Sequence, residues 1–241
     1  MKSSLTRNVI KRNYALVTPD GQVPSVLPGW TGCTPFVLIS PALGAGFSQF
    51  LMNLDSTSEG VGETGNDEWF LYAIAGNMVV NGMALSQGGF AFLPPQTKYE
   101  VRGAIANSQL LIFKKTYEQL AGQRPPELFA GNEKNIPEGP FLGDERARLK
   151  TLIPDSLAAD MAVNVFTFDP GATLPFVETH VMEHGMLFLA GGGIYRLDAD
   201  WHPVTAGDVL WIAPYCPQWF IAAGPLTTRY IYYKNINRLP E

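Results

Sequence analysis

The sequence predicts an all-β protein, and three observations support that fold class. Short runs rich in β-branched and aromatic residues recur along the chain, and most are bounded by Gly or Pro. The 24 glycines and 19 prolines among 241 residues favour many turns between short strands over long helices. The same series of runs also occurs twice, which indicates two copies of one module.

Nine runs are expected to be strands. Four lie in the first half of the chain: Phe36–Ser40, Phe47–Met52, Trp69–Ile74 and Gly89–Leu93. Five lie in the second half: Met161–Phe168, Met186–Ala190, Gly193–Leu197, Val209–Ile212 and Thr228–Tyr233. Between residues 114 and 151 the sequence is charged and contains several prolines, with few such runs. We expect a connector there, with a helical turn or two at Gly143–Leu152.

The two halves of the sequence correspond to each other in order and spacing. Three pairs of segments match: 68–76 with 183–191, 88–95 with 207–214, and 40–46 with 169–175. Two copies of an all-β module of about 100 residues account for the length and for the central connector. The predicted ranges are an N-terminal module at 1–115, a connector at 116–150 and a C-terminal module at 151–241.

Composition and charge exclude several classes of protein. Hydrophobic residues make up 46% of the chain and charged residues 16%, so a core can form and disorder is not expected. The formal net charge of −5 argues against nucleic acid as a partner, because nucleic-acid binders normally carry a basic surface. The sequence has neither a run of about 18 apolar residues nor the apolar stretch of a signal peptide. We therefore expect a cytoplasmic protein without membrane contact.

Two of the three histidines lie four residues apart, in Glu178-Thr-His180-Val-Met-Glu-His184. If residues 177–181 form a strand, Glu178 and His180 point to one face, and His184 would join them across a bend. A carboxylate oxygen and two imidazole nitrogens suit a divalent first-row metal such as Mn, Fe, Co, Ni or Zn. The alternative is a pair of polar surface histidines. The third histidine, His202, lies in a turn-like segment and is expected to be an ordinary surface residue.

The spacing of this segment resembles the first motif of the cupin superfamily. That motif typically runs Gly, five residues, His-x-His, three or four residues, Glu, six residues and Gly. Here Glu178-x-His180 is followed after three residues by His184 and after six more by Gly191. Two residue types are exchanged, because Glu stands at the first His position and His stands at the Glu position.

The second cupin motif runs from a Gly through a Pro to a His eleven residues after the Gly. Here Gly207 leads through Pro214 to Gln218, so the resemblance implies Gln218 as a fourth metal ligand. It also implies the fold: a bicupin of two tandem double-stranded β-helix (jelly-roll) barrels joined by a partly helical connector. The matching positions of the first copy are Glu63, Gly65, Trp69 and Tyr99. Only one of these four suits a metal, so the first barrel is expected to be metal-free.

The exchanged ligands resemble one bicupin family in particular, the (S)-ureidoglycine aminohydrolases of purine (allantoin) catabolism. Five segments carry this resemblance: Asn13–Gly21, Glu178–His180, Glu183–Gly185, Gly193–Tyr195 and Tyr230–Lys234. The resemblance implies a manganese-dependent hydrolase that converts (S)-ureidoglycine and water to (S)-ureidoglycolate and ammonia. It implies four ligands of Mn²⁺, namely Glu178, His180, His184 and Gln218.

The resemblance also implies the residues around the substrate, which are Tyr195, Tyr230 and Lys234. Lys234 would pair with the substrate carboxylate, and Glu178, Tyr230 and Lys234 would take part in catalysis. For the general base, Glu178 and Glu183 both stay open.

Two other functions are compatible with a cupin of this composition. One is a dioxygenase that uses Fe(II), and the other is a non-catalytic barrel that binds a small molecule. In each case the expected partner is a small molecule, and the bicupin resemblance implies a homo-oligomer.

Overall fold

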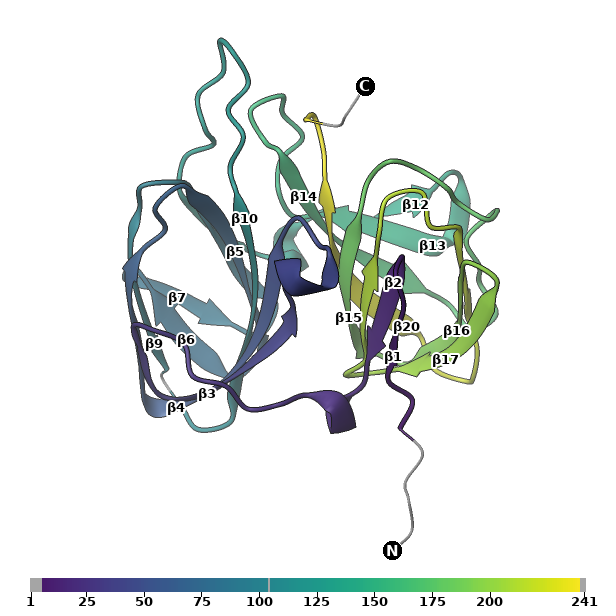
Figure 1. Ribbon diagram of the computed structural model, residues 1–241, viewed down its shortest axis with the longest axis horizontal. Helices are drawn as coiled ribbons and strands as arrows, with labels where there is room; N and C mark the ends of the chain where they lie inside the picture. The colour runs from purple at the N-terminus through teal and green to yellow at the C-terminus, as the bar shows by residue number, and fades with distance from the viewer. Residues whose placement is uncertain (1–5, 104, 239–241) are drawn as a thin grey trace, which may run out of the picture. The chain divides into compact units, whose positions relative to one another are not determined.

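The computed structural model describes residues 6–103 and 105–238 and confirms an all-β fold. The ends of the predicted ranges, 1–5 and 239–241, lie outside the described residues. The chain divides into two compact units (Figure 1). The described residues of unit 1 are 6–22, 137–152 and 161–238, and those of unit 2 are the remainder.

Unit 1 contains an eight-stranded sheet and a three-stranded sheet. The eight-stranded sheet has the spatial order β1 (Val9–Ile10), β2 (Tyr14–Val17), β18 (Val209–Ile212), β15 (His184–Ala190), β20 (Thr228–Asn235), β14 (Met161–Phe168), β13 (Asp144–Thr151) and β12 (Gly139–Phe141). The three-stranded sheet has the order β17 (Asp200–Thr205), β16 (Gly192–Leu197) and β19 (Gln218–Ala222). Every strand pairing in unit 1 is antiparallel.

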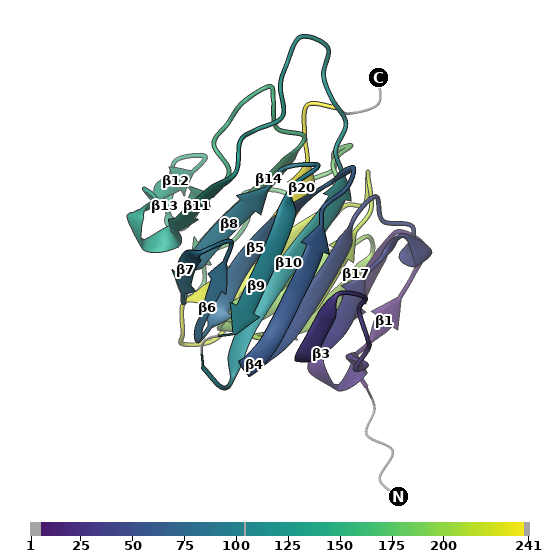
Figure 2. The same ribbon diagram turned by 90° about the vertical axis from the view of Figure 1, so that its left-hand side faces the viewer.

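Unit 2 contains one nine-stranded sheet, which Figure 2 shows from its face. Its spatial order is β11 (Phe129–Asn132), β8 (Gly89–Leu93), β5 (Asp67–Ala75), β10 (Ser108–Thr116), β4 (Ser48–Glu63), β9 (Lys98–Gly103), β6 (Asn77–Val80) and β7 (Met83–Ser86), and β3 (Trp30–Ile39) pairs with β4. The 16-residue strand β4 pairs with β10 through its first half and with β9 through its end, so one strand joins both parts of the sheet.

Helix is confined to three single turns of 3-10 helix in the described residues: η1 (Pro19–Gly21), η2 (Pro41–Leu43) and η3 (Glu133–Asn135). In this part of the chain, no helix has the length and apolar character needed to cross a membrane.

All nine predicted strands are strands, but the prediction of helical turns at Gly143–Leu152 is wrong. Residues 144–151 form β13, which pairs with β14. The turn before it consists of Leu142 and Gly143, both with positive φ, a backbone shape that favours a tight hairpin. The charged residues that resembled a helix lie on a strand that is paired on both sides, next to the edge strand β12.

The compact units differ from the predicted ranges at the start of the N-terminal module and just after the connector, and the connector itself is divided between the units after residue 136. Residues 6–22 belong to unit 1, because β2 pairs with β18. Residues 153–160, which separate β13 from β14, belong to unit 2. Their anchor is a buried ion pair between Asp160 and Lys115, and Asp160 also accepts the backbone N–H of Glu118 at 2.7 Å.

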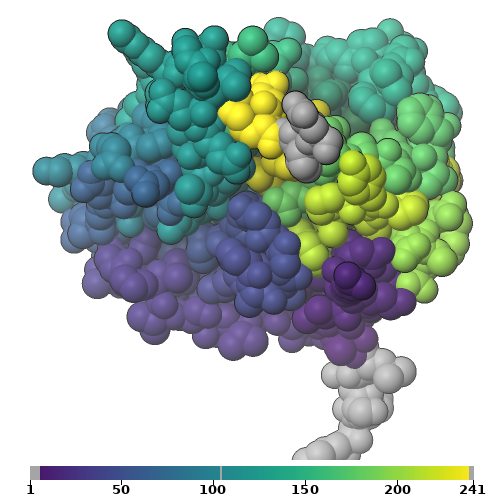
Figure 3. Space-filling model, turned by 45° about the horizontal axis from the view of Figure 1, so that its top comes forward, coloured from purple at the N-terminus to yellow at the C-terminus, as the bar shows by residue number. Residues whose placement is uncertain are grey.

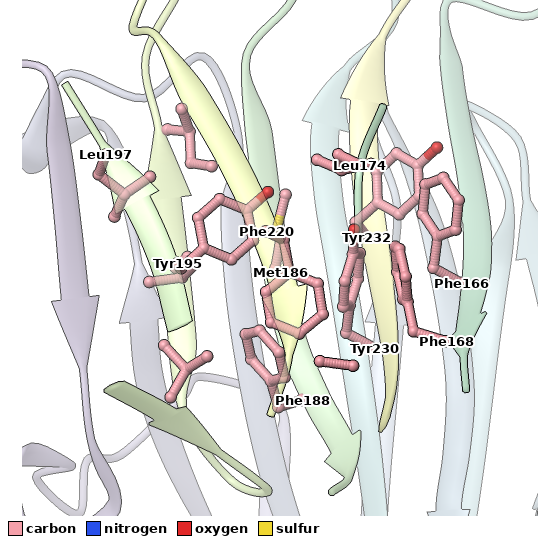
Figure 4. Packing of buried hydrophobic residues seen from close by; sticks show 14 of the residues in the cluster. Phe166, Phe168, Leu174, Met186, Phe188, Tyr195, Leu197, Phe220, Tyr230 and Tyr232 are labelled. Carbon is pink, nitrogen blue, oxygen red and sulfur yellow. The ribbon is translucent and has the colours of Figure 1, made fainter. Parts of the chain in front are cut away.

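The core of unit 1 is rich in aromatic side chains from both of its sheets (Figure 4). On β16, the alternate residues Gly193, Tyr195 and Leu197 are buried, as expected for a strand with one face toward a core. The Tyr230 ring packs against Phe166 and against Phe188, at ring-centroid distances of 5.5 and 5.2 Å. This packing forms the floor beneath the polar residues described next.

Candidate active site

One cavity in unit 1, of about 200 Å³, is lined by all seven residues that the sequence analysis placed in the site. These residues are Glu178, His180, His184, Tyr195, Gln218, Tyr230 and Lys234. Four strands and one loop supply them: β15, β16, β19 and β20, together with the segment that precedes β15. The structure therefore brings the predicted residues together, while their individual roles stay predictions.

Strand register fixes where these side chains lie. On the large sheet, His184 pairs with Ile212 on one side and with Lys234 on the other, so the three side chains share a face. The sequence places Glu178 and His180 on one face only if residues 177–181 form a strand. They do not form one. Instead Glu178 forms an isolated bridge with Gln218, with backbone N···O distances of 2.8 and 2.9 Å.

The two histidines present facing lone pairs. His180 Nδ1 is 3.1 Å from the carbonyl oxygen of Met182, and His184 Nδ1 is 3.2 Å from that of Tyr233. Because a carbonyl only accepts, each Nδ1 carries the hydrogen and each Nε2 is left as an acceptor. The two Nε2 atoms are 3.2 Å apart.

Burial keeps both rings neutral. It lowers the pKa of His180, and it lowers the pKa of the fully buried His184 to about 3. Two neutral nitrogens that face each other with their lone pairs repel unless a hydrogen-bond donor or a cation lies between them. The two Nε2 atoms together can therefore bind a positively charged atom.

Gln218 completes this group. Its Nε2 lies 3.1 Å from His180 Nε2, and its Oε1 accepts the Tyr195 hydroxyl at 3.0 Å. Tyr230 in turn is hydrogen-bonded to Tyr195. Rotation of the amide by 180° would exchange its oxygen and nitrogen, and the Tyr195 hydroxyl has acceptor capacity for the amide N–H. The amide therefore serves as donor or as ligand without a change of backbone.

Glu178 and Lys234 give the cavity one acidic and one basic group. Burial raises the pKa of Glu178, and the positive charge of Lys234 opposes that shift. Lys234 makes no ion pair with a carboxylate among residues 6–103 and 105–238. Its ammonium group is therefore available to an anionic ligand.

The donor set fits a divalent first-row cation. The described residues contain no three His, Cys, Asp or Glu side chains grouped closely enough to hold a metal ion by themselves. The close group instead consists of two imidazoles and the amide of Gln218, and Glu178 is joined to Gln218 through the backbone. Imidazole, amide oxygen and carboxylate oxygen together are a ligand set for Mn, Fe, Co, Ni or Zn.

The cavity also has an apolar part of its lining, which no motif in the sequence marks. Its residues are Phe141, Phe166, Leu174, Met182 and Met186. Phe141 comes from β12, and its ring packs edge-on against Phe166 at a centroid distance of 4.9 Å. The one local signal for Phe141 is the Leu142-Gly143 turn that follows it, which marks a hairpin but not its place in the fold.

Two further residues, His202 and Glu183, have different surroundings from the residues of the cavity. His202 is not an ordinary surface residue: it is half-buried on β17, and its Nε2 lies 3.1 Å from the Tyr14 hydroxyl. Glu183 is buried beside Trp211, whose indole N–H lies 3.4 Å from Glu183 Oε2. In contrast to Glu178, Glu183 is not among the described residues that line the cavity.

Comparison with solved structures gives the class of protein. The chain superimposes on the Escherichia coli protein Ylba with a TM-score of 0.88 and 34% identity, covering 98% of this chain and 97% of the other. It also superimposes on a cupin-2 conserved barrel domain protein from Leptotrichia buccalis, with a TM-score of 0.61, 15% identity and coverage of 89% and 92%. At that identity the likeness concerns the fold alone, and that fold is the cupin barrel.

Sequence comparison gives the family. No protein-family model matches the chain. It is 36% identical over 240 residues to the (S)-ureidoglycine aminohydrolase of Arabidopsis thaliana, covering 98% of this chain and 80% of the relative. It is 35% identical over 243 residues to the enzyme of that name from Escherichia coli K12, covering 96% of this chain and 92% of the relative. The chain belongs to the (S)-ureidoglycine aminohydrolase family, which confirms the resemblance seen in the sequence.

Proposed function

We propose that this protein hydrolyses (S)-ureidoglycine to (S)-ureidoglycolate and ammonia. In the reaction the bond between the α-carbon and its amino group breaks, a bond to a water oxygen forms, and the amino group leaves as ammonia. Two observations support the assignment: membership of the family, and the cavity in which two neutral histidines face each other beside Glu178, Gln218 and Lys234.

We also propose that each unit is one cupin barrel of a bicupin. The strand order β18–β15–β20–β14 in unit 1 has its counterpart in β8–β5–β10–β4 of unit 2. The register corresponds as well, because His184 pairs with Ile212 and Lys234, and Trp69 pairs with Leu93 and Lys114. These pairings support the repeat of about 100 residues seen in the sequence.

A divalent cation would be held by Glu178, His180, His184 and Gln218, and we propose that it is Mn²⁺. When bound, such a cation supplies Lewis-acid polarisation and a fixed orientation to groups of the substrate. The feature of this chain that supports the proposal is the pair of histidine Nε2 atoms, which lie 3.2 Å apart and carry no hydrogen.

Lys234 is proposed to bind the substrate carboxylate, because its ammonium group faces the cavity without a carboxylate partner among the described residues. Tyr195 and Tyr230 are fully buried, and burial holds the pKa of each hydroxyl well above its ordinary value. Both therefore stay protonated, and a substrate oxygen could replace Gln218 Oε1 as the acceptor of the Tyr195 hydroxyl. A cavity of about 200 Å³ suits a small metabolite rather than a larger ligand.

Glu178 is proposed to transfer the proton between water and the leaving amino group. It lines the cavity, and burial raises its pKa above the ordinary value of a glutamate, which makes the carboxylate a better proton acceptor. Glu183 is the weaker candidate. Unit 2 has a buried glutamate, Glu68, at the corresponding position, so this position belongs to the shared framework of the two units.

We propose a cytoplasmic homo-oligomer that binds neither nucleic acid nor membrane; the net charge of −5 supports the first exclusion. The bicupin resemblance supports the oligomer, and light scattering coupled to size-exclusion chromatography measures its subunit number.

The test of the function is ammonia release from (S)-ureidoglycine, generated in place from allantoate, with protein loaded with Mn²⁺. We expect release well above the spontaneous rate and formation of the (S) product. The matched sample is the same protein after treatment with a chelator. Ammonia release at the spontaneous rate, with bound Mn²⁺ verified by elemental analysis, would contradict the proposal. Oxygen consumption by Fe²⁺-loaded protein with catechols or thiols would instead favour a dioxygenase.

A further inference from the structure

Residues of the segment 11–14 contact the turn and the loop that precede Gln218. Figure 3 shows the purple N-terminal residues against the yellow-green surface of unit 1. Strand β2 pairs with β18, and Tyr14 lies directly opposite Ile212, which lies opposite His184. Tyr14 is therefore in the same interior row as the histidine of the site, two strands away.

A corresponding row crosses the small sheet. Glu178 is bridged to Gln218, Gln218 pairs with Leu197, and Leu197 pairs with Asp200. The two rows meet where the Tyr14 hydroxyl donates to Asp200 Oδ2 at 2.6 Å. Lys11 also contacts this carboxylate. The contact joins β2 of the large sheet to β17, an edge strand of the small one.

Asn13 holds the tight turn at 197–200 from its other side. Its side-chain N–H donates to Asp198 Oδ2 at 3.0 Å, an unambiguous direction because a carboxylate only accepts. Asp198 has a φ of +56°, and its backbone N–H donates to the carbonyl of Pro217 at 2.7 Å. Pro217 immediately precedes Gln218, so the turn is attached to the start of the strand that carries the amide.

The backbone of Asn13 reaches the same loop at its beginning. The Ala213 N–H donates to the Asn13 carbonyl at 3.0 Å, and Ala213 starts the loop that ends at Gln218. Within this loop, the Tyr215 N–H donates to the His180 carbonyl at 2.7 Å. Asn13 therefore contacts the start of this loop directly and its end through Asp198. The loop is hydrogen-bonded to one candidate ligand and leads into another.

We propose that Asn13 and Tyr14 are positioning residues that fix Gln218 and His180 for cation binding. They touch neither the cavity nor the reacting atoms, and they act through the 197–200 turn and the 213–217 loop. The inference rests on the proposed function, because it assumes that Gln218 and His180 are cation ligands. It assigns a role to the segment Asn13–Gly21, which matches the family in sequence but lies outside the cavity.

The sharpest test exchanges the two partners of one hydrogen bond. Asn13→Asp places two carboxylates against each other and breaks the contact. The double variant Asn13→Asp with Asp198→Asn restores it with donor and acceptor reversed, and Asn tolerates the positive φ of position 198. Tyr14→Phe removes the contact with Asp200 and keeps the ring. Asn8→Ala is the matched control, because it removes the bond from the Thr18 N–H to Asn8 Oδ1 in the same segment but away from the turn.

Two quantities are measured: the dissociation constant of Mn²⁺ by competition with a chelator, and hydrogen exchange of peptides that cover residues 197–200 and 213–222. We expect Asn13→Asp to weaken Mn²⁺ binding about tenfold, the lower range for residues that orient metal ligands. Exchange in these peptides should become about fivefold faster, as for the loss of one hydrogen bond. The double variant should return both quantities to near the wild-type values.

The proposal is overturned if Asn13→Asp leaves both quantities unchanged, or if Asn8→Ala weakens Mn²⁺ binding equally. It is also overturned if the double variant does not restore exchange while it folds as the wild type by circular dichroism. If the wild-type protein binds no Mn²⁺ and releases no ammonia from ureidoglycine, the proposed function fails. Hydrogen exchange then decides alone whether the N-terminal residues fix the Gln218 loop.

Discussion

The interior of unit 1 at His184 and the interior of unit 2 at Trp69 have the same strand register but different contents. Each residue pairs with an aliphatic residue on one side, Ile212 or Leu93, and with a lysine on the other. In unit 2 the Trp69 ring packs on Tyr99, with centroids 4.7 Å apart. In unit 1 the same place holds a cavity lined by both polar and apolar side chains.

The residues around these two positions also differ between the two units. Tyr99, the counterpart of Gln218, pairs with Gly62, so register makes Gly62 rather than Glu63 the counterpart of Glu178. A Cβ atom on Gly62 would lie 2.7 Å from the Tyr99 hydroxyl oxygen, which leaves no room for a larger side chain. Glu63 is exposed. The Tyr99 side chain therefore blocks the space that an acidic side chain would need.

The two lysines differ in their partners. Lys114 lies 3.0 Å from Asp67 and over the ring of Trp69. Lys234 has no such carboxylate in the described part of the chain and faces the cavity. The comparison indicates that aromatic packing at these positions is enough to form the fold. Buried polar groups cost stability unless each is paired, so the polar residues at these positions of unit 1 indicate function rather than folding.

The largest expected effect is on His184. His184→Ala removes one of the two facing nitrogens, and the loss of Lewis-acid assistance should lower ammonia release about a thousandfold. Bound Mn²⁺ per protein should fall in parallel, as measured by elemental analysis. A variant that keeps both its metal and its activity would exclude His184 as a ligand.

Trp69→Ala makes the matching change in unit 2. It should destabilise the protein by about 3–5 kcal/mol through the cavity left in a packed core. Urea denaturation followed by circular dichroism measures this loss. Ammonia release per folded molecule should stay at the wild-type level. A specific loss of activity in the folded fraction would show that unit 2 takes part in the chemistry.

Lys234→Met tests the unpaired cation. Loss of a charge-assisted hydrogen bond to the substrate carboxylate should lower kcat/KM by about tenfold to a hundredfold, mainly through KM. Lys114→Met is the control at the corresponding register position, and it should leave kcat/KM unchanged. Its exposed ion pair is worth at most about 1 kcal/mol of stability. Equal kinetic effects of both changes would remove the distinction between the two lysines.

The smallest effect is expected from Gly62→Ala. The added methyl group meets Tyr99, and such overpacking should cost about 1 kcal/mol of stability. Thermal unfolding measures the shift, and activity should not change. An unchanged midpoint would mean that the Tyr99 ring moves aside easily, which would weaken the argument that it closes this space.

Local signals in the sequence were sufficient for nine of the strands, and motif spacing together with the family resemblance was sufficient for seven residues of the cavity. Runs such as Met161–Phe168 and Val209–Ile212 are bounded by breakers and coincide with β14 and β18. The segment at Gly143–Leu152 was misassigned because its alternating charges resemble those of a short helix. The apolar wall with Phe141, and the burial of His202 against Tyr14, had no local signal, because both depend on strands distant in sequence.

The sequence by itself determined the repeat, the nine strands and the spacing of Glu178, His180, His184 and Gln218, because periodicity and motif spacing are local properties of the chain. The tertiary structure decided which residues meet. Register placed Glu178 beside Gln218, and carbonyls of Met182 and Tyr233 fixed which nitrogen of each histidine is free. The tertiary structure also placed Asn13 against the loops next to the site. Such contacts arise from pairing between distant strands, which no short stretch of sequence encodes.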